Sequence, residues 1–173
     1  SSALYGIYTN IATTKNRVCS NNSIDNLTGS AIYNTGVVVG IYAFGSNLNQ
    51  IHNNTVSNIT AVGTITGIYF SGVNPSVYDN IVYNITTSGS TLRGILNAGT
   101  GITNCYRNKV YNLISNNTVP SLSGIYISQG FDNRVYNNLV GNLTTPSANS
   151  TAAIAGIYVN AGTSISLSHN TIY

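Results

Sequence analysis

Short runs of apolar residues alternate with polar residues along the whole chain, and the runs recur with nearly the same amino-acid sequence. The clearest copy is Gly67-Ile68-Tyr69, followed by the stretch 77–86 with the sequence VYDNIVYNIT. The runs are rich in Ile, Val, Thr and Tyr and are interrupted by Gly and Asn. This pattern predicts brief β-strands joined by tight turns, and it does not fit helices.

Six copies can be aligned on a Gly-Ile pair, and successive glycines lie 27 to 34 residues apart. The glycines are Gly6, Gly40, Gly67, Gly94, Gly124 and Gly156. One apolar column contains Ile24, Val56, Val82, Val110, Val140 and Ile172. A period in this range indicates a solenoid, a propeller or another repeat array. Because short strands bury their apolar side chains only when the next copy stacks on them, we predict an all-β parallel β-helix of about six coils.

A resemblance to a known family supports this prediction. The Gly-Ile-Tyr phrase, an asparagine between two apolar positions, and the closing motif of Asn58-Ile59-Thr60, Asn84-Ile85-Thr86 and Asn142-Leu143-Thr144 carry it. On these motifs the sequence resembles the right-handed parallel β-helix repeats of the pectin-lyase-like superfamily. The resemblance implies one solenoid over residues 1–173, and it leaves the activity open.

The amino-acid sequence of the repeats also resembles that of long exported proteins of the Bacteroidetes. This resemblance implies secretion to the cell surface by the type IX system. We also expect the chain to be a segment of a longer protein, or one that stacks end to end, because neither end carries a polar capping segment.

One column consists entirely of asparagine, and its members are Asn22, Asn54, Asn80, Asn108, Asn138 and Asn170. A sharp bend between strands requires a residue that tolerates a positive φ, and asparagine tolerates it well. We therefore predict that these asparagines occupy a bend and that their amides bond from coil to coil as a structural ladder.

Tyrosines also recur in columns. Tyr78, Tyr106 and Tyr136 share one column, and Tyr83 and Tyr111 share another. Stacking between coils would stabilise the sheet. Alternatively, the rings could form a contact surface for sugars or for another copy of the protein.

The charged residues are too sparse for most kinds of catalysis. Only 5% of residues are charged, and Asp25, Asp79 and Asp132 fall in three different columns, so no carboxylate pair is expected to converge. His52 and His169 are expected at the surface, four coils apart, which argues against a shared metal site. We predict no catalytic residues, no metal and no cofactor. The dispersed net charge of +3 also disfavours nucleic acid as a partner.

The two cysteines and the longest apolar run carry two further expectations. Cys19 and Cys105 share an inward column three coils apart, roughly 14 Å, whereas bridged Cα atoms lie within about 7 Å. They are expected to be separate buried thiols. The apolar run 37–44 is far shorter than the roughly 20 residues of a membrane span, so no span is expected.

These observations favour a structural or adhesive segment of a secreted or cell-surface bacterial solenoid, whose partners are other copies of itself or surface polysaccharide. Two alternatives remain open. One is a non-catalytic part of a polysaccharide lyase or hydrolase. The other is an ice-binding solenoid that uses the threonine column of Thr28, Thr60 and Thr86, which Ile114 interrupts.

Overall fold

The computed structural model describes residues 3–10, 15–29, 36–45, 49–149 and 154–173. Within these ranges every regular element is a β-strand, and all strand pairs are parallel. The chain is a parallel β-solenoid, as the repeat pattern predicted.

The strands form three parallel sheets, which we name A, B and C in the order in which each coil visits them. Sheet A contains β1 (Ala3–Asn10), β5 (Val37–Phe44), β8 (Thr64–Val73), β11 (Thr91–Thr100), β14 (Ser121–Ile127) and β17 (Ile154–Val159). Sheet B contains β2 (Arg17–Ser20), β6 (Asn49–His52), β9 (Ser76–Tyr78), β12 (Ile102–Tyr106), β15 (Asp132–Tyr136) and β18 (Ser164–Ser168). Sheet C contains β3 (Ser23–Asp25), β7 (Thr55–Ala61), β10 (Ile81–Thr87), β13 (Lys109–Ser115), β16 (Leu139–Thr144) and β19 (Thr171–Ile172), and β4 (Thr28–Gly29) also pairs with β7.

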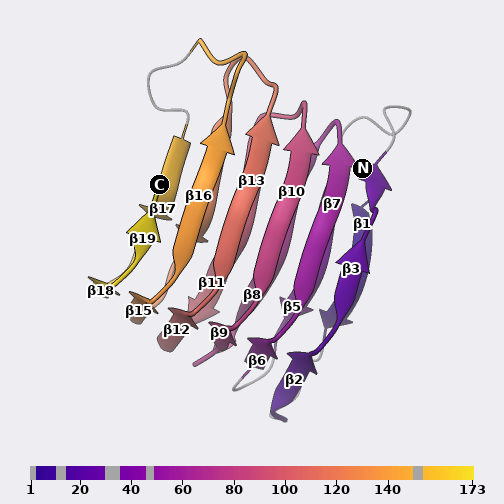
Figure 1. Cartoon of the computed structure of the whole chain (residues 1–173). Helices are drawn as coiled ribbons and strands as arrows, with labels where there is room; N and C mark the ends of the chain where they lie inside the picture. Colours follow the sequence, from indigo (N-terminus) through magenta and orange to yellow (C-terminus); the bar gives the residue numbers. More distant parts are fainter. Residues whose placement is uncertain (1–2, 11–14, 30–35, 46–48, 150–153) are drawn as a thin grey trace.

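Figure 1 shows sheet C in front, with its strands side by side in chain order from β3 to β19. The sequence pattern predicted about six coils, and the structure makes about five turns. The difference arises because the six stacked strands of a sheet are separated by five turns of the chain.

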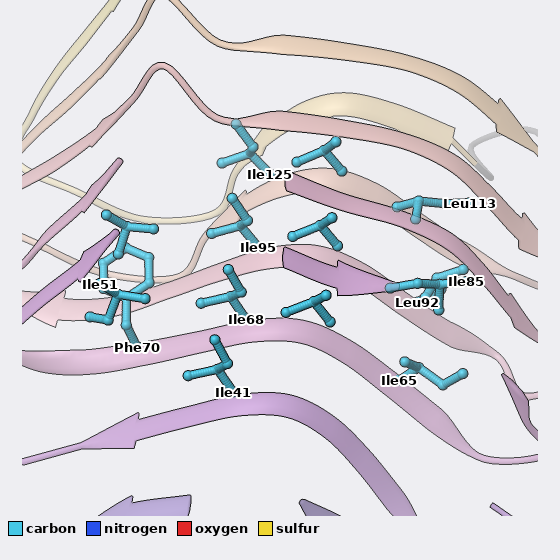
Figure 2. Packing of buried hydrophobic residues seen from close by; sticks show 14 of the residues in the cluster. Ile41, Ile51, Ile65, Ile68, Phe70, Ile85, Leu92, Ile95, Leu113 and Ile125 are labelled. Atoms are coloured by element: carbon cyan, nitrogen blue, oxygen red, sulfur yellow. The ribbon is translucent and has the colours of Figure 1, made fainter. Parts of the chain in front are cut away.

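The register of the sheets matches the sequence columns. Ile41 pairs with Ile68, and Ile95 pairs with both Ile68 and Ile125. These four isoleucines are fully buried and lie one above another in Figure 2. The column of Val56, Val82, Val110 and Val140 is also fully buried. Ile7 and Ile157, on the first and last strands of sheet A, are partly buried and pack against the same core.

The glycine column marks a close approach between sheets A and C. A Cβ atom on Gly67 would lie 2.5 Å from Cγ1 of Val82 and 2.6 Å from the carbonyl oxygen of Gly94. Neither neighbour can move away easily, because the valine is part of the buried core and the oxygen belongs to the next coil. The regular pairing is also interrupted at the glycine, since Thr66 pairs with Arg93 and Ile68 pairs with Ile95. Glycine is therefore required because the backbone of sheet A bends in against the valine column.

Removing a side chain from the isoleucine column should be costly. Ile68 is fully buried between Ile41 and Ile95, and the hydrogen-bonded strands on either side hold the coil spacing fixed. We expect Ile68→Ala to lower the free energy of unfolding by about 2 to 5 kcal/mol, measured by urea denaturation. Val119→Ala, at a side chain that is 61% exposed, is the control and should change it by less than about 0.5 kcal/mol. Equal effects of the two substitutions would contradict the assignment of this column to the core.

Candidate functional site

The asparagine ladder predicted from the sequence is present, and its bonds repeat on every coil. Nδ2 of Asn54 donates to Oδ1 of Asn80 at 2.9 Å, and the backbone N–H of Asn54 donates to the same oxygen at 3.0 Å. Nδ2 of Asn54 also donates to the carbonyl oxygen of Cys19 at 2.9 Å. The same side-chain bonds join the pairs Asn22–Asn54, Asn80–Asn108, Asn108–Asn138 and Asn138–Asn170, at 2.9 to 3.0 Å. Each inner amide therefore satisfies both its donor and its acceptor in the core.

The reason given from the sequence for the asparagine ladder was wrong. At this bend the residues with positive φ are those immediately before the ladder asparagines, namely Asn21, Asn53, Asp79, Arg107, Asn137 and His169. Asn80 itself has no positive φ, whereas Asp79 before it has a φ of 55° and Arg107, before Asn108, has a φ of 53°. The bend tolerates several residue types at the strained position. Asparagine is required one residue later because its amide can both donate to and accept from its own kind.

A second, exposed ladder was not recognised from the sequence as a hydrogen-bonded structure. The asparagines of the closing motif have positive φ values, for example 53° at Asn58 and 54° at Asn84. Their side chains bond in series, from Asn84 to Asn58 at 3.2 Å and from Asn112 to Asn84 at 3.0 Å, and Asn142 donates to Asn112 at 2.6 Å. Here asparagine serves both purposes, because it tolerates the backbone conformation and bonds to the next coil.

The tyrosines Tyr78, Tyr106 and Tyr136 stack as predicted, and His52 extends the column. Ring centroids are 4.9 Å apart for both tyrosine pairs, with interplanar angles of 6° and 2°. His52 was expected at the surface, and its half-buried ring stacks on Tyr78 at 4.7 Å because the two residues are register partners. We call these four rings the aromatic stripe. Its signal in the sequence was the position of His52 directly after Ile51, where three of the other coils carry tyrosine and the first and last coils carry Ser20 and Ser168.

The stacking decides what the aromatic stripe presents to solvent. Because each inner ring lies between two parallel neighbours, the ring faces are covered and the edges are outward. Burial is the main cause that raises the pKa of Tyr106, with a further contribution from the neighbouring tyrosines. The surface is therefore a row of aromatic edges, spaced by one coil.

The second predicted pair, Tyr83 and Tyr111, also stacks, with centroids 5.1 Å apart. This column is shorter than the aromatic stripe, since their register partners on the neighbouring coils are Ser57 and Gly141.

An ion pair lies beside the aromatic stripe. Arg107 binds the carboxylate of Asp79 through two bonds, Nε to Oδ1 at 2.8 Å and Nη2 to Oδ2 at 2.7 Å. The guanidinium carbon of Arg107 is also 4.9 Å from the ring centroid of Tyr106. Chiefly through the hydrogen bond from Arg107, the pKa of the Asp79 carboxyl is held below its usual value. The charges beside the stripe thus neutralise each other.

The other two carboxylates are also engaged locally. Asp25 accepts bonds from Ser57 and Asn58, each at 2.7 Å, and the bond from Ser57 is the main cause that lowers its pKa. Asp132 forms an ion pair with Arg134 at 2.6 Å. Among the residues that the structure describes, no group of three or more His, Cys, Asp or Glu side chains is arranged to hold a metal ion.

The fold and its ladders define a parallel β-solenoid built from asparagine-rich coils. No family model matches the chain, and neither a curated protein nor a solved structure matches it. No helix that could cross a membrane is found among the described residues.

Breaking the asparagine ladder should destabilise the whole solenoid. In Asn80→Leu, the amide of Asn54 loses its acceptor and the carbonyl of Ile51 loses its donor, while Oδ1 of Asn108 keeps only the backbone N–H of residue 80. We expect a loss of about 3 to 5 kcal/mol in the free energy of unfolding, because these groups are buried. Asn84→Gly is the matched control, since it removes an exposed ladder amide and keeps a residue suited to positive φ. The control should cost about 1 kcal/mol or less in the same denaturation experiment, and a reversed order would refute the importance of the buried ladder.

Cys19 and Cys105 are free and buried, as expected. Burial raises the pKa of Cys105 from 9.0 to about 12, so the folded state retains a proton that the unfolded chain loses above pH 9. The stability that the buried, protonated thiol contributes is therefore fully present below pH 9 and is lost as the pH rises toward 12. We expect Cys105→Val, which copies Val77 and Val135 of the same column, to reduce the loss of stability between these pH values. Urea denaturation of both proteins at pH 8 and pH 11 measures the difference, and identical pH profiles would contradict the assignment.

Proposed function

We propose that the chain is a structural and adhesive segment of a secreted or cell-surface bacterial β-solenoid protein, and that its aromatic stripe binds neutral polysaccharide. The observation that carries this proposal is the stripe itself, a row of four stacked rings with centroid spacings of 4.7 to 4.9 Å. A polysaccharide chain aligned with the solenoid axis meets an aromatic edge on each of four successive coils. The repeated aromatic edges of the protein then contact the repeated sugar units of the polymer.

The chemistry of the stripe favours a neutral ligand. Covered ring faces leave little area for stacking on a sugar, whereas the phenol groups of Tyr78, Tyr106 and Tyr136 can donate and accept hydrogen bonds at their edges. Asp79 and Arg107 cancel each other's charge beside these rings. A neutral polymer rich in hydroxyl groups matches this surface better than a polyanion or a polycation does.

The carboxylates support a role without catalysis. Asp25, Asp79 and Asp132 are each bound to neighbouring side chains, and the strand register places them in different columns. A hydrolase of glycosidic bonds uses two carboxyl groups that face each other across the scissile bond. In the proposed function these acids stabilise bends and strands instead.

The alternative of ice binding has weaker support. Thr28 and Thr86 both pair with Thr60, as expected, but Ile114 follows Thr86 in this column. Next to the column lies a hollow of about 440 Å3, lined by Asn84, Thr86 and Ile114 among others. A hollow face of mixed chemistry suits a flat crystal plane poorly.

Two triple variants test the proposed function. Tyr78, Tyr106 and Tyr136 changed together to Phe retain the stacked rings and lose the hydroxyls, so we expect normal thermal stability and no retention on an insoluble neutral polysaccharide. The same residues changed to Ser should lose both stability and retention. Cellulose, chitin and a β-1,3-glucan serve as the polymers, with thermal unfolding as the fold control.

The outcomes separate the possibilities. If wild type binds none of the polymers, or if the Phe variant binds as wild type does, the stripe only stabilises the sheet and the proposal fails. Self-association in sedimentation experiments that disappears in the Phe variant would assign the stripe to contacts between copies instead.

A further inference from the structure

A groove lies along sheet A, separate from the aromatic stripe on sheet B. The groove has a volume of about 320 Å3 and runs across β11, β14 and β17. Its lining includes Arg93, Ser123, Tyr126, Ile154, Ala155 and Tyr158. This volume is in the range of small-molecule sites in proteins.

The glycine column creates the groove. At Gly124 the backbone lies so close to the core that a Cβ atom there would be 2.3 Å from Cγ1 of Val140. Ser123 and Tyr126 lie on the two sides of this bend, and both line the groove. On earlier coils the position of Ser123 is occupied by the larger Val39 and Thr66, whereas Ser123 and Ala155 leave the space open.

Two buried hydrogen-bond donors in this groove have no partner among the described residues. Ser123 is only 3% exposed, and its Oγ forms no hydrogen bond. Nε of Arg93 is also buried and unbonded. Burying an unsatisfied donor is costly, and folded proteins rarely do so without a reason. The two residues are register partners on adjacent strands, so their side chains are neighbours.

The orientation of Arg93 is set by an aromatic ring. Its guanidinium carbon lies 4.3 Å from the ring centroid of Tyr126, which is a cation–π contact. The ion pairs found in the described part of the chain involve Arg107 and Arg134, and neither includes Arg93. A guanidinium that stacks through its face keeps its N–H edge available for an anion.

We propose that this groove binds an organic monocarboxylate. The two carboxylate oxygens match the fork of N–H donors along the edge of Arg93, and the hydroxyl of Ser123 supplies a further bond. One cation and one hydroxyl suit a single negative charge better than the double charge of a phosphate. The exposed side chains of Ile154 and Tyr158, together with Tyr126, form an apolar wall for a ring-shaped body.

An aromatic acid and a carboxylated sugar share this chemistry, and a titration distinguishes them. The probes are sodium benzoate and sodium glucuronate, with benzamide and glucose as neutral counterparts, at constant ionic strength. The readout is the Nε–H resonance of Arg93 in 1H–15N NMR spectra, assigned by its loss in Arg93→Lys. We expect a saturable shift with at least one acid and none with the neutral compounds. The acid that binds more tightly shows whether the groove prefers an aromatic ring or a sugar.

Variants connect the binding to the two donors. We expect Arg93→Gln to weaken binding by about tenfold or more, and Ser123→Ala by a smaller factor, in calorimetric titrations with the better acid. Arg93→Lys should also weaken it, because lysine retains the charge and loses the planar fork. Lys109→Gln is the matched control, since it removes an exposed cation from sheet C, and it should leave the affinity unchanged.

Several results would overturn the proposal. They are the absence of a saturable shift with both acids, equal binding by Arg93→Gln and the Lys109→Gln control, and full affinity in a folded Ser123→Ala variant. Thermal unfolding of each variant confirms that it is folded, and Ser123→Ala decides the question if Arg93→Gln is not. This groove and the aromatic stripe lie on different sheets, so the failure of one proposal leaves the other standing.

Discussion

Parallel pairing in a single register is the constraint on which the rest of this structure depends. Each position of a coil lies opposite the same position of the next coil, one strand spacing away, so every side chain must be compatible with a copy of itself. Asparagine fulfils this condition in the core, because one amide carries both donors and an acceptor. The bond from Asn54 to Asn80 is repeated from Asn80 to Asn108 with the same length of 2.9 Å. Isoleucine and tyrosine fulfil the condition by packing and by ring stacking.

The same constraint explains why the chain carries so few charges. A charged residue placed in one column on every coil would face like charges at about 4.8 Å on both sides, which is destabilising. The charges that occur are arranged to avoid this. Asp79 and Arg107 alternate in sign within one column, and Arg134 pairs with Asp132 on its own strand. A surface that is poor in charge is thus a consequence of stacking.

The glycine and valine columns set the cross-section of the solenoid and, indirectly, its surface. Gly67 lets sheet A approach Val82, and Gly124 does the same against Val140. The inward bend that improves packing in the core produces a depression on the outside. Where the residue before the glycine is small, as at Ser123, the depression becomes a groove with an arginine in its wall. Core packing and a candidate binding site therefore have a common cause.

The sequence alone determined the features that depend on repetition: the parallel solenoid, the isoleucine and valine columns, the asparagine ladder, the stacked tyrosines and the separated cysteines. Periodicity reveals these because a position that recurs in a stacked chain must contact its own copies. The tertiary structure decided what depends on local backbone geometry and on contacts between different columns. It placed the positive φ at Asp79 and not at Asn80, since several residue types tolerate that conformation and no pattern marks it. It also showed the groove at Arg93 and Ser123, because the distance between a glycine and the valine behind it is set by how sheets A and C pack together.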